Sequence, residues 1–75
     1  MVYPNPNDGN FNINFVDISG LKNVIVYDML KKFITSFSTY DNMIEVNAKH
    51  ILSSGMYLLK VETSGGTFVA KVVIE

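Results

Sequence analysis

The clearest pattern in the chain is an unbroken alternation of polar and apolar residues from Asn10 to Phe15. A period of two places alternate side chains on opposite faces of a β-strand. We therefore expect Phe11, Ile13 and Phe15 to face a core, with the asparagines between them facing solvent. The segment Lys22–Asp28 differs, because its β-branched and aromatic residues form a near-continuous apolar run. That composition favours a central strand with limited solvent on either face.

Four later stretches also have strand patterns, separated by short segments rich in turn residues. In the second of them, Ile44, Val46 and Ala48 are expected to face inward. The first is the most ambiguous, because Tyr27–Ile34 could instead form two helical turns. Short strands at this spacing indicate an all-β domain, either a β-sandwich or a small barrel. The four predicted strands are Phe33–Ser38, Met43–Ala48, Gly55–Thr63 and Thr67–Ile74, and Ser64–Gly66 is the predicted hairpin turn between the last two.

Composition narrows the possible functions. The chain has 75 residues, enough for one domain, and 48% of them are hydrophobic, which is sufficient for a folded core. Six lysines and no arginine face seven acidic residues, so the basic patch that nucleic-acid binding needs is missing. Without cysteine, the chain can form neither disulfides nor thiolate metal sites, and no cofactor is expected. No apolar run reaches the length of a membrane span, and an amino-terminal export signal would have to lie in a longer parent chain.

Candidate catalytic and metal-binding residues do not form a recognisable site. His50 is the single histidine, and its neighbours Ser53 and Ser54 are poor partners because catalytic triads are assembled from separate segments. A calcium loop of EF-hand type with Gly9 as its internal glycine would place Pro4 and Pro6 at ligand positions, so the Asn-rich opening is interpreted as a turn. The carboxylates show no paired spacing that would suggest glycoside hydrolysis. They are Asp17, Asp28, Asp41, Glu45 and Glu62.

Two features involve tyrosine. The four tyrosines could form a sugar-stacking platform, although packing in the core or at an edge is the favoured alternative. The segment Leu52–Tyr57 combines a leucine, a glycine and a tyrosine that enters a strand. This order is similar to the tyrosine corner of immunoglobulin-like sandwiches, in which the phenol hydroxyl bonds to upstream backbone. The tyrosines are Tyr3, Tyr27, Tyr40 and Tyr57.

Four blocks, in order and covering essentially the whole chain, resemble the type A C-terminal sorting domain of type IX secretion. The blocks are Tyr3-Pro4-Asn5-Pro6 with Gly9, Val26–Leu30 with Lys32, Leu52–Val61 and Gly66–Ile74. The resemblance implies an immunoglobulin-like β-sandwich of about seven antiparallel strands, spanning residues 1–75 at the carboxyl end of a larger exported protein. It implies a non-catalytic signal that directs cargo, attached in cis, through the periplasm and across the outer membrane to the cell surface or the medium.

The same resemblance implies the partners and the residues that carry the signal. The partners are the type IX translocon, an outer-membrane shuttle protein and a sortase-like peptidase that typically removes the domain and joins the cargo to the surface. We expect recognition through strand addition to an exposed edge of Thr67–Ile74, and such edges also leave dimerisation open. The expected signal residues are Pro4, Asn5, Pro6, Gly9, Tyr27, Asp28, Gly55, Tyr57, Val61, Gly66, Lys71 and Val72.

Two positions depart from the family pattern. Lys31 occupies a position where the family usually has glycine, and a lysine in left-handed geometry costs roughly 1 kcal/mol, so a turn of another type or length is possible there. Glu75 ends the chain where lysine or arginine is common, which implies weaker engagement if a terminal positive charge is recognised. The main alternative function is an accessory carbohydrate-binding or fibronectin-like module of a secreted hydrolase. Such a module would be retained in the mature protein, whereas a sorting signal would be lost.

Overall fold

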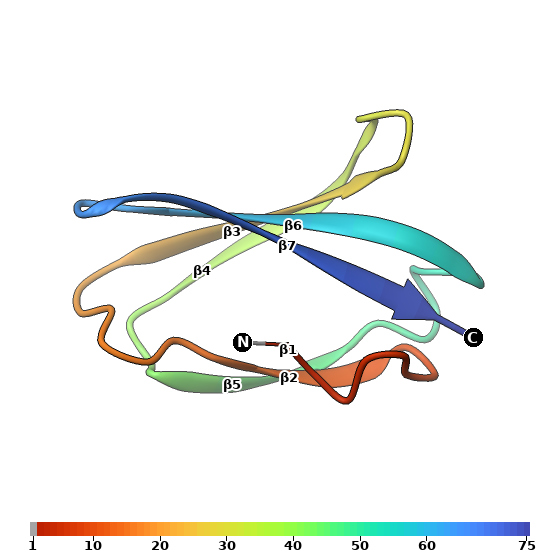
Figure 1. Ribbon diagram of the computed structural model, residues 1–75, viewed down its shortest axis with the longest axis horizontal. Coiled ribbons are helices and arrows are strands. Elements are labelled where there is room, and N and C mark those ends of the chain that lie inside the picture. The colour runs from red at the N-terminus through yellow and green to blue at the C-terminus, as the bar shows by residue number, and fades with distance from the viewer. Residues whose placement is uncertain (1) are drawn as a thin grey trace.

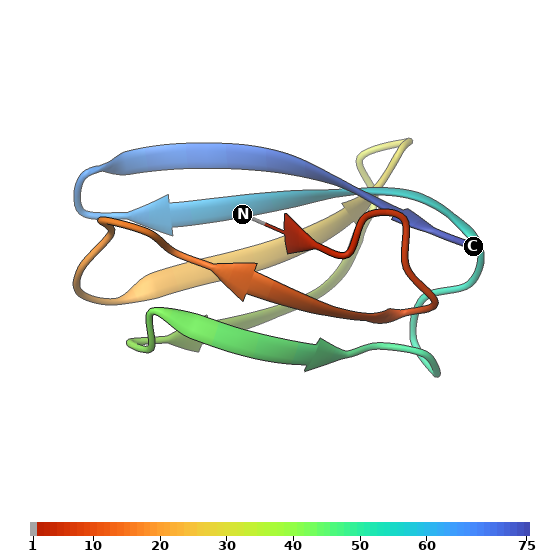
Figure 2. The same cartoon turned by 60° about the horizontal axis from the view of Figure 1, so that its bottom comes forward.

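Two antiparallel sheets packed face to face make up the computed structural model, which describes residues 2–75 (Figures 1 and 2). One sheet has three strands in the order β1-β2-β5, and the other has four in the order β4-β3-β6-β7. The predicted β-sandwich of seven strands is therefore confirmed. The strands are β1 (Val2–Tyr3), β2 (Asn10–Asn14), β3 (Lys22–Asp28), β4 (Phe33–Thr39), β5 (Met43–Asn47), β6 (Gly55–Thr63) and β7 (Gly66–Ile74).

The alternating residues of β2 form the centre of the core, as the sequence pattern predicts. Phe11, Ile13 and Phe15 are buried, and they face the larger sheet, where the inward side chains of β3, β6 and β7 are equally buried. Strand β3 lies between β4 and β6, which confirms its central position. On β5 the expected inward residues are half-buried, and Ala48, just beyond the strand, is fully buried.

The segment that could have been helical is a β-hairpin. Strand β3 continues to Asp28 and pairs with β4, so the helical alternative over Tyr27–Ile34 is wrong. The pairing register shifts after Val26, because Val26 lies opposite Thr35 while Tyr27 lies opposite Phe33. The extra residue between them makes a β-bulge in β4, which increases the local twist and bends the strand. Figure 1 shows the hairpin turning away from the body of the sandwich.

The turn of this hairpin keeps left-handed geometry at the position where the sequence departs from the family pattern. Lys31 has a φ of 65°, and its N–H donates to the Asp28 carbonyl at 3.0 Å. The Asp28 N–H donates in turn to the Lys32 carbonyl at 3.0 Å, which closes a three-residue loop. This loop type normally places glycine in the left-handed position, because a side chain there is strained. The turn therefore adopts this loop type even though lysine occupies its left-handed position.

Replacing this lysine by glycine should stabilise the domain. Lys31→Gly removes left-handed strain of about 1–2 kcal/mol, and the extra entropy that glycine loses on folding offsets part of the gain. We expect a net increase of about 0.5–1 kcal/mol in the free energy of unfolding, or a few degrees in Tm. Thermal unfolding followed by circular dichroism measures it. Lys32→Gly, at a position without positive φ, removes the same charge and should lower Tm; a similar rise in both variants would contradict the assignment of strain.

One lysine is buried where the sequence alone suggested an ordinary strand start. Lys22 is fully buried, and its ammonium donates to the carbonyls of Gly20 and Tyr40 at 3.0 and 3.2 Å. The same ammonium lies 5.4 Å from the centre of the Phe15 ring, within the range of a cation–π contact. Lys22 thereby links the loop before β3 to the turn after β4.

Candidate recognition site

Sequence blocks that lie far apart in the chain meet at one end of the larger sheet. Asp28 of β3 lies opposite Tyr57 of β6, which lies opposite Val72 of β7. The adjacent row joins Tyr27 to Lys71 through the strand between them. Five of the expected signal residues therefore occupy two neighbouring cross-strand rows.

The opening segment completes this arrangement, because Asn5 and Asn7 bind the outer edge of β7. We call these two residues the clamp. The Asn5 side-chain amide donates to the Lys71 carbonyl at 2.8 Å, and its oxygen accepts the Val73 N–H at 2.8 Å. Two residues later, the Asn7 N–H donates to the Val73 carbonyl at 2.9 Å, and the Glu75 N–H donates to the Asn7 carbonyl at 2.8 Å. The chain thus pairs first with β2 as β1 and then, after Pro4, with the last strand of the other sheet.

Asn7 is a site residue that the sequence analysis missed. Its side chain is buried; its amide donates to the Pro4 carbonyl at 3.0 Å and its oxygen accepts the Gly9 N–H at 2.8 Å. These bonds fold the segment that carries Pro6 into a compact turn. Gly9 has a φ of 106°, and an added Cβ would lie 3.0 Å from Cα of Lys49. The one sequence feature that could have indicated this role is the residue type, because asparagine side chains can hydrogen-bond to nearby backbone groups in turns.

The predicted tyrosine corner is confirmed. The Tyr57 hydroxyl donates to the Ser53 carbonyl at 2.7 Å, and the ring is buried in the core cluster that also includes Leu52. Gly55 precedes the tyrosine with a φ of 148°, a conformation that side chains rarely adopt. This block therefore fixes the start of β6, a structural role.

Two expected signal residues lie away from this end. Val61 faces the core opposite Phe68, and Gly66 pairs with Thr63 at the β6–β7 hairpin. The predicted turn is one residue shorter than expected, because Gly66 already belongs to β7. The candidate recognition residues are therefore not one continuous surface.

The first half of the β7 edge is open. The N–H and C=O groups of Val73 and the C=O group of Lys71 point outward and bond to the clamp. Backbone groups alternate in direction along an antiparallel strand. The N–H and C=O groups of Thr67 and Val69 therefore point outward as well. Strand β7 ends its sheet, and Val69 is 66% exposed. Sequence patterning identified the strand but could not show which half of its edge is covered.

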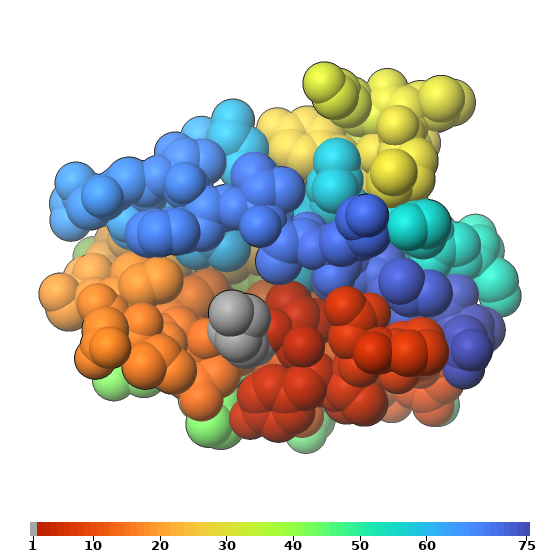
Figure 3. Space-filling view, viewed as in Figure 1, coloured from red at the N-terminus to blue at the C-terminus, as the bar shows by residue number. Residues whose placement is uncertain are grey.

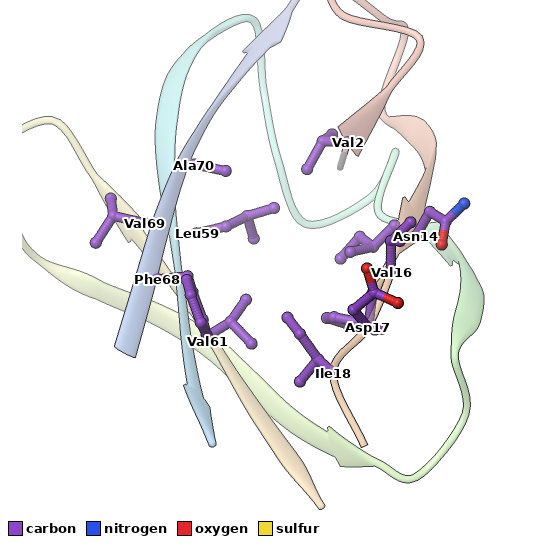
Figure 4. A pocket seen from close by; sticks show the side chains of 12 residues that line it. Val2, Asn14, Val16, Asp17, Ile18, Leu59, Val61, Phe68, Val69 and Ala70 are labelled. Atoms are coloured by element: carbon purple, nitrogen blue, oxygen red, sulfur yellow. The ribbon is translucent and has the colours of Figure 1, made fainter. Parts of the chain in front are cut away.

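An apolar groove of about 540 Å³ lies beneath this open edge, between the two sheets. Figure 4 shows Ala70 and Leu59 pointing toward Val2 across the groove, while Val69 points away from it. Phe68, at the same edge, is 48% exposed. The backbone of an added strand would hydrogen-bond to the open edge of β7, and its inward side chains would enter the apolar groove.

Features that would support chemistry are dispersed. Among residues 2–75, no group of three or more His, Cys, Asp or Glu side chains could hold a metal ion. His50 lies exposed in the loop before β6. The pKa of the Asp8 carboxyl is lowered, first by its hydrogen bond from Lys49 and then by the Asn10 N–H. Asp8 and Lys49 form an exposed ion pair at 3.1 Å, a surface feature of small energetic weight.

The tyrosines do not form a common platform either. Tyr57 is buried in the core, and Tyr3 is in the smaller sheet. Tyr27 is on β3 of the larger sheet, and Tyr40 is 72% exposed in the turn after β4. Their separation removes the feature that would have favoured a carbohydrate-binding module.

Comparison with known proteins identifies the family of this chain. No helix among residues 2–75 has the length and hydrophobicity needed to cross a membrane. Curated protein sequences give no significant match. The family described as the secretion system C-terminal sorting domain matches residues 1–75, which is the whole chain. Members of this family are sorting signals, and the chain belongs to the type IX secretion C-terminal sorting domains.

Proposed function

We propose that this domain is the detachable export address of a larger protein whose cargo precedes it. The observation that carries the proposal is the family match over the full chain. The cargo would pass from the periplasm across the outer membrane, guided by the translocon and an outer-membrane shuttle protein. A sortase-like peptidase would then remove the domain, and the cargo would remain at the cell surface or be released.

The open half of the β7 edge is the proposed point of contact with the export machinery. Unpaired backbone groups on an edge strand can bind an extended segment of a partner through strand addition. The outward groups of Thr67 and Val69 supply the hydrogen bonds. The groove beneath them accepts alternate apolar side chains of the added strand, which gives the contact specificity beyond the backbone.

The clamp limits this contact to about half of the strand. Asn5 and Asn7 already occupy the outward groups from Lys71 to Glu75. Pro4, Asn5, Pro6 and Gly9 therefore act indirectly in this proposal, by holding the strand in place and leaving the first half free. Tyr27 and Lys71, two of the expected signal residues, have side chains on the outer face of the sheet, because their neighbours Val26 and Val72 face the core.

Val69→Pro tests the strand-addition contact. Proline removes the outward N–H and places a ring at the edge, yet it is tolerated at solvent-facing positions of edge strands. We expect the full-length cargo protein with this substitution to accumulate in the periplasm, as fractionation and immunoblotting would measure. The matched control, Val69→Thr, keeps the N–H and should be exported normally.

The fold of each variant must be checked independently, because export also fails when the domain unfolds. We expect the Val69→Pro domain to melt cooperatively within a few degrees of the parent. Surface display of the Val69→Pro protein at parental levels would count against the edge contact. Gly66→Val is a less specific test, because Gly66 has a φ of 138° and a β-branched residue there would strain the hairpin turn.

A further inference from the structure

The β3–β4 hairpin carries exposed apolar side chains away from the body of the domain. Leu30 at its tip is 90% exposed, and Met29 and Phe33 beside it are 49% and 56% exposed. Met56, at the start of β6, is 40% exposed. Figures 1 and 3 show the hairpin, in yellow, standing above the rest of the molecule. We call Met29, Leu30, Phe33 and Met56 the hairpin patch.

Strand register places part of this patch on the outer face of the larger sheet. Phe33 lies opposite Tyr27, and Tyr27 lies opposite Leu58, which is two residues from Met56. The residues that alternate with them, such as Tyr57, face the core. The outer face of the larger sheet is therefore apolar next to the hairpin. This apolar surface continues toward the hairpin tip.

Unpaired positive charge accompanies the patch. Lys31 and Lys32 directly follow Leu30, and Lys71 lies opposite Leu58 on the same outer face. None of these three ammonium groups pairs with another residue in the described part of the chain. The remaining lysines are engaged elsewhere: Lys22 with two carbonyls, Lys49 with Asp8 and Lys60 with Glu62.

Acidic groups at this end do not cancel the positive charge of the tip, because Asp28 carries one negative charge against the two positive charges of Lys31 and Lys32. Asp28, at the base of the hairpin, directs one carboxylate oxygen to the N–H groups of Leu30 and Lys32, at 2.8 and 2.9 Å. Glu75 follows β7, on the far side of β6 from the hairpin. The other acidic residues lie in the smaller sheet, in loops, or in the ion pairs already described.

We propose that the hairpin patch is a docking surface for a lipid bilayer with anionic headgroups. Binding at a membrane interface strengthens with the apolar area that is buried and with electrostatic attraction to anionic lipids, and an exposed apolar tip flanked by lysines supplies both. The leucine and its neighbours would enter the boundary between headgroups and acyl chains, while the lysines contact the phosphates. A protein partner fits less well, because lysine is depleted at protein interfaces and two lysines directly follow the leucine at this tip.

Vesicle co-sedimentation of the 75-residue chain tests the proposal. The probes are vesicles of phosphatidylcholine alone and of an equal mixture of phosphatidylcholine and phosphatidylglycerol. We expect binding to the mixed vesicles that weakens as salt is added. Leu30→Glu should reduce this binding about ten-fold or more, the equivalent of one buried leucine side chain. Replacing Lys31 and Lys32 by glutamine should reduce it by roughly five-fold per lysine.

Tyr40→Glu is the matched control. It adds the same charge at a position that is 72% exposed in the turn after β4, outside the hairpin patch, and it should bind vesicles almost as well as the parent. Equal losses in the Tyr40→Glu and Leu30→Glu variants would overturn the proposal. So would the absence of binding to either vesicle, which would leave a protein as the occupant. The test is independent of the export function, since a chain that binds no vesicles can still be an export signal.

Discussion

Substituting Gly9 by alanine is expected to destabilise the domain by about 3 kcal/mol. Two costs add at this position. The backbone φ of 106° strains any residue with a side chain, at about 1–2 kcal/mol. The new Cβ would also lie 3.0 Å from Cα of Lys49, a backbone atom that cannot move aside cheaply, and overpacking costs about 1–3 kcal/mol. Chemical denaturation of the isolated variant measures the loss.

Gly20→Ala separates the two costs. Gly20 has a φ of 83°, yet no atom lies within 4 Å of the position that its Cβ would take. This variant should therefore lose only the conformational part, about 1–2 kcal/mol. If the two variants lost the same free energy of unfolding, the close approach of Gly9 to Lys49 would not contribute to stability.

Deleting residues 72–75 is expected to unfold the domain. Val72 and Ile74 are 1% and 4% exposed, and each side chain contributes about 1.5–3 kcal/mol through burial. The deletion also removes backbone partners of Asn5 and Asn7. The combined loss of about 5 kcal/mol is comparable with the whole stability of a domain this size, at about 0.05–0.15 kcal/mol per residue. Circular dichroism and limited proteolysis would show the result.

Removal of Glu75 alone is the control for this truncation. It removes one N–H that donates to the Asn7 carbonyl, a change worth about 1 kcal/mol, and should leave the domain folded. A folded chain ending at residue 71 would contradict the structural role of the last strand. It would mean that truncation impairs export through loss of the address itself. Under the expected outcome, a truncated protein that stays in the periplasm says nothing about recognition, which is why the edge variant Val69→Pro is needed.

Much of the fold could be predicted from local patterns. The alternation around Phe11 and Ile13 indicates a half-buried strand because the period of side-chain direction is fixed by the backbone. The block ending at Tyr57 predicts a tyrosine corner because its partner, Ser53, lies only four residues away. The clamp could not be predicted in this way. Asn5 bonds to residues 66 and 68 positions later, and no local pattern indicates which distant edge an amide will reach.

The burial of the Lys22 ammonium could not be predicted from the sequence either. Lys22 opens an apolar run, and a lysine there is normally expected to reach solvent. Its burial depends on two carbonyls from separate loops and on the Phe15 ring, which meet only in the folded state. The extent of the open half of the β7 edge could not be predicted for the same reason, because it depends on which backbone groups Asn5 and Asn7 bind in the folded state.

The seam between the first and last residues has a consequence for biosynthesis. Ribosomes make the amino end first, so Asn5 and Asn7 cannot meet their partners until the segment from Lys71 to Glu75 has been made. Closing a loop of this length is entropically costly, and contacts between distant residues form slowly. A chain interrupted before residue 73 keeps only the bond from Asn5 to the Lys71 carbonyl and loses the three bonds that involve Val73 and Glu75. Formation of these bonds thus requires that both ends of the domain have been synthesised, and the export machinery would meet a finished β7 edge only on molecules that contain residues 71–75.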